Sequence, residues 1–72
     1  MMKRTYTDSS NLKSVGYDEE SEILEIEFLH GGIYQYFNVP KSVYEELMNV
    51  DSHWKYFDRN VKKAGYRYRK IG

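Results

Sequence analysis

The sequence predicts a small single α+β domain, in which an antiparallel β-meander is covered on one face by two helices in the order β-β-β-α-α-β. Three observations predict this class: apolar and acidic residues alternate over residues 23–29, a glycine pair precedes an aromatic run at residues 31–39, and helical apolar patterns follow Pro40. The 72 residues suffice for one small core. We expect a flexible N-terminal tail at residues 1–8 and the domain at residues 9–72.

The first two strands are expected at residues 12–17 and 23–29, with a polar loop of hairpin length between them. Alternation in the second strand separates two faces. The apolar face carries Leu24, Ile26 and Phe28, and the acidic face carries Glu25 and Glu27. A four-residue loop then places Val15 beside Ile26 and Tyr17 beside Leu24.

The third strand begins at the glycine pair Gly31-Gly32, because two central glycines tolerate the positive φ angles of a two-residue hairpin turn. This turn sets His30 opposite Ile33 and buries Ile33, Phe37 and Val39 with the apolar face of the second strand. Tyr34 and Tyr36 then face outward beside the glutamates. We therefore expect the double substitution Tyr34→Ala/Tyr36→Ala to leave the fold intact.

Pro40 suits the first turn of a helix, which is expected over residues 41–49 with an apolar stripe that includes Val43, Leu47 and Val50. Asp51 or Ser52 is the expected cap of a second helix, whose apolar line Trp54, Phe57, Val61 and Ala64 ends at Gly65 as a left-handed cap. Residues 66–71 alternate aromatic and basic side chains, as a short edge strand does. Its place beside the first or the third strand stays open.

The net charge is zero, but the charges are segregated along the chain. Residues 1–16 carry +2, residues 17–50 carry −7 and residues 51–72 carry +5. This asymmetry fits either a charged partner or attraction between the two halves of the chain. With no cysteine and no apolar run after the first basic residues, we expect a soluble, cytoplasmic protein without disulfides, a cysteine zinc site or membrane contact.

We expect no catalytic residue, no metal site and no cofactor, and hence not an enzyme. Asp51-Ser52-His53 contains the residue types of a hydrolytic triad, but three consecutive side chains cannot form that relay, so a helix cap is the better interpretation. His30 has no second ligand at a metal-binding spacing.

Nucleic-acid binding is the more specific of two functional hypotheses, because phosphates attract cations and unpaired bases stack on flat rings. The candidate residues are Arg59, Lys62, Lys63, Tyr66, Arg67, Tyr68 and Arg69, with Tyr34 and Tyr36. The glutamates expected beside the tyrosine pair argue against a phosphate at that pair. The expected partner is single-stranded RNA or tRNA, and about four phosphate contacts would give a salt slope near −3. The alternative is a protein-interaction module or homo-oligomer that uses exposed Tyr and Trp side chains as anchors.

Several segments together resemble the KTSC domain family, over about residues 9–71. They are Ser9-Ser10-Asn11-Leu12, Gly16-Tyr17-Asp18, Gly32-x-Tyr34-x-Tyr36, Val39-Pro40 and Lys55-Tyr56-Phe57. The family occurs at the C-terminus of some lysyl-tRNA synthetases and as small stand-alone bacterial and phage proteins, with Tyr-x-Tyr as its central mark. The resemblance implies an accessory domain for which RNA binding is only a suggestion. The chain departs from the family at Trp54, where a glycine is expected.

Overall fold

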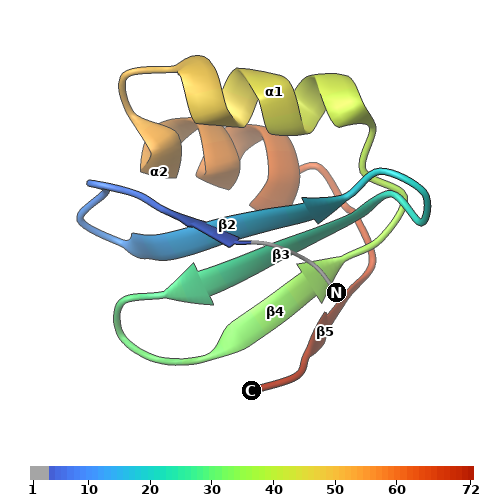
Figure 1. Cartoon of the computed structure of the whole chain (residues 1–72), viewed down its shortest axis with the longest axis horizontal. Coiled ribbons are helices and arrows are strands. Elements are labelled where there is room, and N and C mark those ends of the chain that lie inside the picture. Colours follow the sequence, from blue (N-terminus) through green and yellow to red (C-terminus); the bar gives the residue numbers. More distant parts are fainter. Residues whose placement is uncertain (1–3) are drawn as a thin grey trace.

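The computed structural model describes residues 4–72 as five antiparallel strands in sequential order, with the helices layered on one face of the sheet (Figure 1). The elements are β1 (Arg4–Tyr6), β2 (Leu12–Asp18), β3 (Ile23–Phe28), β4 (Ile33–Tyr36), α1 (Lys41–Asn49), α2 (His53–Phe57), the π-helix η1 (Asp58–Lys62) and β5 (Tyr68–Lys70). The predicted α+β class and the meander topology are confirmed.

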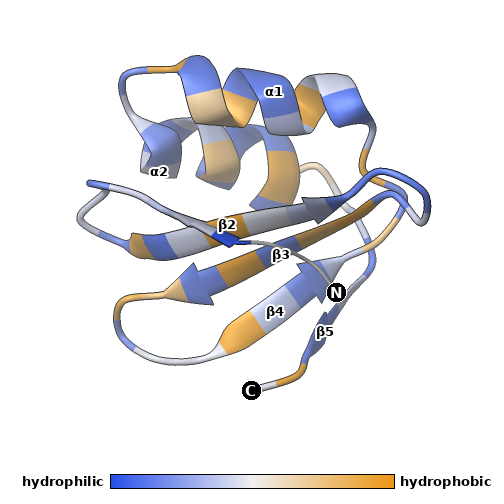
Figure 2. Cartoon of the chain, viewed as in Figure 1, coloured by the Kyte–Doolittle hydropathy of each residue, from blue (hydrophilic) through white to orange (hydrophobic). Residues whose placement is uncertain are grey.

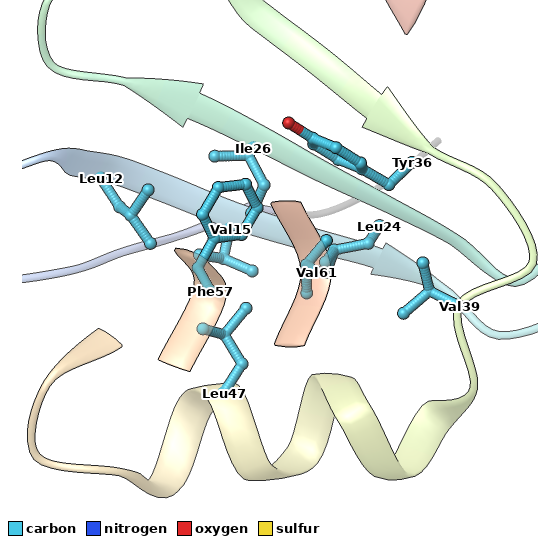
Figure 3. Close-up of a cluster of buried hydrophobic side chains, with 9 residues drawn as sticks. All are labelled: Leu12, Val15, Leu24, Ile26, Tyr36, Val39, Leu47, Phe57 and Val61. Atoms are coloured by element: carbon cyan, nitrogen blue, oxygen red, sulfur yellow. The ribbon is translucent and has the colours of Figure 1, made fainter. Parts of the chain in front are cut away.

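The core lies between the helices and the sheet. Along β3 the hydropathy alternates from residue to residue (Figure 2), and its apolar side chains Leu24 and Ile26 are fully buried. Helix α1 contributes Leu47, and the segment from α2 through η1 contributes Phe57 and Val61, so that both helical segments close over the same face (Figure 3). The predicted pairing of Val15 with Ile26 and of Tyr17 with Leu24 is confirmed.

A strand, β1, forms where the sequence predicted a tail. Arg4–Tyr6 pairs with Ser14–Gly16 of β2, while residues 1–3 of the expected tail lie outside the described residues. The Arg4 guanidinium reaches Glu25 and Glu27 on β3, with nitrogen–oxygen distances of 3.3 and 3.6 Å. A three-residue edge strand held by partners far along the chain leaves no local periodicity, so the pattern of residues 1–8 could not reveal it.

The predicted register between β3 and β4 is wrong by three residues. Leu24 pairs with Tyr36 and Ile26 with Tyr34, whereas Glu27 pairs with Ile33. The connection is a three-residue loop: the Gly31 amide donates to the Phe28 carbonyl (3.1 Å) and the Phe28 amide to the Gly32 carbonyl (3.0 Å). Both glycines have positive φ angles, 102° and 95°, as a turn followed by a glycine bulge requires.

An odd register shift moves every side chain of a strand to the other face. Tyr34 and Tyr36 therefore lie on the helix-covered face, and Ile33 is half-buried on the uncovered face with the glutamates. Strand β4 ends at Tyr36, because Asn38 turns the chain with a φ of 60°. Val39 is still buried as predicted, while Phe37 is only half-buried.

Helix α1 has the predicted bounds, and Ser52 caps α2 by accepting a hydrogen bond from the Lys55 amide. The second helix does not continue as one α-helix. After Phe57 it widens into η1, where the Lys63 amide donates to the Asp58 carbonyl, five residues back (3.0 Å). The wider turn removes Ala64 from the predicted apolar line and leaves it exposed. Gly65 follows with a φ of 90°, in the left-handed conformation expected for a cap.

The last strand, β5, pairs antiparallel with β4, which settles the position that the sequence left open. Tyr36 lies opposite Tyr68, and Tyr34 lies opposite Lys70. Further hydrogen bonds continue this pairing beyond β5. The Ile71 and Gly72 amides donate to the Ile33 carbonyl (2.7 and 3.3 Å), and the Ile33 amide donates to the Gly72 carbonyl (3.1 Å). The basic-aromatic C-terminal segment is thereby placed next to the Tyr-x-Tyr strand.

Candidate nucleic-acid interface

A groove of about 500 Å³ opens at the boundary between the sheet and α2–η1. Five rings line it, from β3, β4, α2 and β5: Phe28, Tyr34, Tyr36, Trp54 and Tyr68. The polar side chains in the lining are Asn11, His30 and Lys62. We call this feature the aromatic groove. Its volume falls within the range of small-molecule sites, and so does its largely aromatic lining with a few polar groups.

The rings of the aromatic groove are held by contacts with one another and with the core. Tyr36 and Phe28 pack edge-on against the buried Phe57, with ring centroids 5.4 and 5.6 Å apart. Tyr68 lies over both tyrosines of β4, 5.5 Å from Tyr36 and 6.0 Å from Tyr34. Since Phe57 is fully buried, its contacts give these rings a rigid base.

Trp54 occupies the α2 side of the groove and contacts Phe57 at a centroid distance of 5.9 Å. Among the aromatic contacts within residues 4–72, none joins Trp54 to a tyrosine of the groove. The indole is thus part of the lining without closing directly onto Tyr34 or Tyr68. Where the family resemblance led us to expect a glycine, this chain has a flat ring beside the groove.

Lys62 supplies the cation of the groove. Its ammonium nitrogen lies 5.6 Å from the centroid of the Trp54 ring, within the range of a cation–π contact. The π-helix explains this placement, since a π turn accommodates one residue more than an α turn. Lys62 is the last residue of η1, at the end of this wider turn.

Tyr36 is the most buried ring of the groove, with 5% of the residue exposed. Its hydroxyl makes no hydrogen bond to any residue within 4–72. Burial, with smaller contributions from Tyr68 and Tyr34, raises the pKa of Tyr36 to about 12. At neutral pH the hydroxyl is protonated, so it can both donate and accept a hydrogen bond.

Four of the nine predicted site residues meet in the groove: Tyr34, Tyr36, Lys62 and Tyr68. The other five do not line it, namely Arg59, Lys63, Tyr66, Arg67 and Arg69. The Lys63 ammonium pairs with the Asp58 carboxylate at 3.0 Å, and Arg69 lies opposite Gln35 and so belongs to the other face of the sheet. Tyr66 packs half-buried against the core.

The expected conflict between the tyrosine pair and the glutamates is absent, because the glutamates lie on the uncovered face of the sheet. There Glu25 accepts a hydrogen bond from the Gln35 amide group (2.9 Å), and Glu27 accepts one from the Ser14 hydroxyl (3.1 Å). Arg4 bridges the two carboxylates. The prediction that Glu25 and Glu27 would repel a phosphate at Tyr34 and Tyr36 is therefore wrong.

Asn11, Phe28 and His30 belong to the groove but were not predicted as site residues. Phe28 was assigned to the core by its alternation, and it does pack there while keeping one side in the groove. Asn11 enters because its carbonyl accepts from the Leu29 amide (2.9 Å), which ties the start of β2 to the β3–β4 loop. That long-range bond has no signature in the local sequence.

The segment Asp51-Ser52-His53 is used for capping, as expected. The Ser52 hydroxyl accepts from the Lys55 amide (3.3 Å), and the His53 ring nitrogen Nδ1 lies 2.7 Å from the Leu47 carbonyl oxygen. Within residues 4–72, no group of three or more acidic, histidine or cysteine side chains could hold a metal ion. No helix in this part of the chain is long and apolar enough to cross a membrane.

Comparison with known proteins places this geometry in a family. The family model for the KTSC domain matches residues 8–68. An uncharacterized protein of Stutzerimonas stutzeri is 44% identical over 70 residues, which is 97% of this chain and 99% of that protein. A crystal structure of a KTSC domain protein from Yersinia pestis superposes with a TM-score of 0.94 at 38% identity, covering 100% of both chains.

A lysine–tRNA ligase of Nostoc punctiforme is 38% identical over 55 residues, covering 76% of this chain. The match spans 10% of the ligase, so the similarity concerns one small region of that enzyme. A ligase of another Nostoc strain matches in the same way, at 36% identity over 64 residues and 11% of its length. The matches to the family model, to the stand-alone protein and to the solved structure agree, and the chain belongs to the KTSC domain family.

Proposed function

We propose that this chain is a non-enzymatic accessory domain that binds single-stranded RNA by stacking unpaired bases in the aromatic groove. The observation that carries the proposal is the meeting of Tyr34, Tyr36 and Tyr68 with Lys62 at one groove. Stacking on an aromatic ring contributes about 1–3 kcal/mol of binding free energy per base, and a lysine attracts the phosphate. The similarity to a region of lysine–tRNA ligases supports an RNA ligand over other polyanions.

Tyr68 is the most informative ring to remove, because it is 62% exposed and packs on both tyrosines of β4. We expect Tyr68→Ala to weaken binding of a 12-nucleotide single-stranded RNA by about 5- to 150-fold, the equivalent of one stacked base. Tyr6→Ala is the matched control, since Tyr6 is 72% exposed on the edge strand at the other side of the sheet. The control should bind like the parent protein.

The binding assay can use the protein's own fluorescence. The chain contains one tryptophan, Trp54, and it lines the groove, so a stacked base should quench its emission. Titrations at low salt with mixed-sequence RNA would give the affinity without a label. If Tyr68→Ala and Tyr6→Ala bind equally, the aromatic groove is not the site. If no RNA binds even at low salt, the proposal fails.

The second candidate function is a protein-interaction or self-association module, and the β5 edge favours it. Tyr68 in β5 and Ile71 just after it leave 62% and 47% of their surface exposed, and among residues 4–72 no strand pairs with the outer edge of β5. Such an edge can pair with another chain. Sedimentation of the protein over a concentration series decides between the two candidates. A dimer that is dissociated by Tyr68→Ala, in a protein that binds no RNA, would support the self-association module.

A further inference from the structure

We propose that the aromatic groove takes a single nucleotide, with its base among the rings and its phosphate at Lys62, and not a tract of several nucleotides. This inference rests on the proposed function and specifies its ligand. The ligand class is a nucleoside 5′-monophosphate unit, whether free or as an unpaired nucleotide at the end of an RNA strand.

The size of the groove is the first argument. A volume of about 500 Å³ lies toward the lower end of the range of small-molecule sites. Phe57 lies beneath the rings of the groove and contacts Phe28, Tyr36 and Trp54. The groove therefore has room for one nucleotide, with its base against the rings of the lining.

The distribution of cations is the second argument. Lys62 and His30 are the basic side chains in the lining. Lys63 is paired with Asp58, and Arg69 belongs to the opposite face of the sheet. Lys70 lies opposite Tyr34 on the same face of the sheet but outside the lining, so Lys62 is the lysine within the groove itself. Binding should release counterions from about one phosphate.

The uncommitted hydroxyl of Tyr36 is the third argument. This hydroxyl makes no hydrogen bond within residues 4–72, and it is not among the buried atoms that lack a partner, so solvent reaches its oxygen. The edge of a base inserted among the rings can replace water as its hydrogen-bond partner. The hydroxyl is therefore available to a base in the groove.

The test is a fluorescence titration of the full chain with AMP and three RNA probes. The RNA probes are a blunt 12-base-pair duplex, the same duplex with one unpaired 3′ adenosine nucleotide, and a 12-nucleotide single strand. We expect AMP and the single-overhang duplex to bind within about fivefold of the single strand, with the blunt duplex inert. The salt slope should be near −0.7, the value for one phosphate of a single strand. If AMP binds and the overhang does not, the ligand is a free nucleotide.

A comparison of AMP with adenosine tests the role of Lys62. We expect the parent protein to prefer AMP by up to about fivefold, the strength of an exposed ion pair. Lys62→Ala should abolish the preference, whereas Lys63→Ala, which removes the same charge one residue away, should keep it. Equal preference in the two variants would overturn the assignment of the phosphate to Lys62.

The failure of this inference can be told apart from the failure of the proposed function. A single strand that binds more than 100-fold tighter than AMP, with a slope near −3 as about four phosphates would give, overturns the single-nucleotide inference and leaves RNA binding in place. If neither the single strand nor AMP quenches Trp54 at low salt, both proposals are wrong.

Discussion

Replacement of Tyr36 by alanine should remove a large part of the stability of the domain. The expectation that Tyr34→Ala/Tyr36→Ala leaves the fold intact depended on the wrong register and is replaced by this one. Tyr36 is 5% exposed, and its ring packs against Phe57 and Tyr68 at centroid distances of 5.4 and 5.5 Å. Truncating a buried aromatic ring to alanine costs about 3–5 kcal/mol. A domain of 72 residues has a free energy of unfolding of about 4–11 kcal/mol, so the loss is comparable to the whole.

The assay is urea unfolding followed by circular dichroism. At a slope of about 1 kcal/mol per molar urea, the midpoint of Tyr36→Ala should fall by about 3–5 M, or the variant should be unfolded in buffer. Tyr36→Phe keeps the ring and removes a hydroxyl that has no partner within residues 4–72, so its midpoint should shift by less than 1 M. Tyr6→Ala controls for the loss of an exposed tyrosine.

The same assay tests the register of the β3–β4 hairpin. If His30 faced Ile33 across a two-residue turn, Tyr36 would be exposed and Ile33 would be in the core. Tyr36→Ala would then shift the free energy by less than about 1 kcal/mol, and Ile33→Ala by about 2–5 kcal/mol. A result in that order would refute the register and the position of the aromatic groove. The structure predicts the opposite order, because Ile33 is half-buried on the uncovered face.

Three further predictions concern pH, a helix cap and a glycine. Burial raises the pKa of both Tyr36 and Tyr56 to about 12, and a 2.6 Å hydrogen bond to Glu46 adds to the effect at Tyr56. The folded chain therefore keeps phenol protons that the unfolded chain releases near pH 10. Between neutral pH and about pH 9 these two groups leave the stability unchanged, and the stability should fall between pH 10 and 12. Tyr56→Phe should make the fall shallower, and a midpoint independent of pH between 10 and 12 contradicts this reasoning. Ser52→Ala removes the acceptor for the Lys55 amide and should lower the free energy of unfolding by about 1 kcal/mol, with Ser52→Asp as the variant that restores it. Gly65→Ala should destabilise by about 1–2 kcal/mol in the same urea assay through its φ of 90° alone, because an added Cβ meets no atom within 4 Å; a neutral effect would show that the cap relaxes.

The sequence by itself determined the elements whose signal is local. Alternation along residues 23–28 fixed β3 and its buried face, Pro40 fixed the start of α1, and the Ser52 cap fixed the start of α2. The family was also recognisable from motifs along the chain. Each of these signals depends on neighbours within a few residues, where dihedral preferences and hydrophobic periodicity act directly.

Only the tertiary structure decided the features on which the candidate site depends. A glycine pair is compatible with a two-residue turn and with a three-residue loop, and the choice between them reverses the faces of Tyr34 and Tyr36. The pairing of β5 with β4 brings Tyr68 to Tyr36, and the packing of α2 on the sheet brings Trp54 and Phe57 to the same place. These contacts join segments far apart in the chain, so local preference could list the residues of the aromatic groove but could not bring them together.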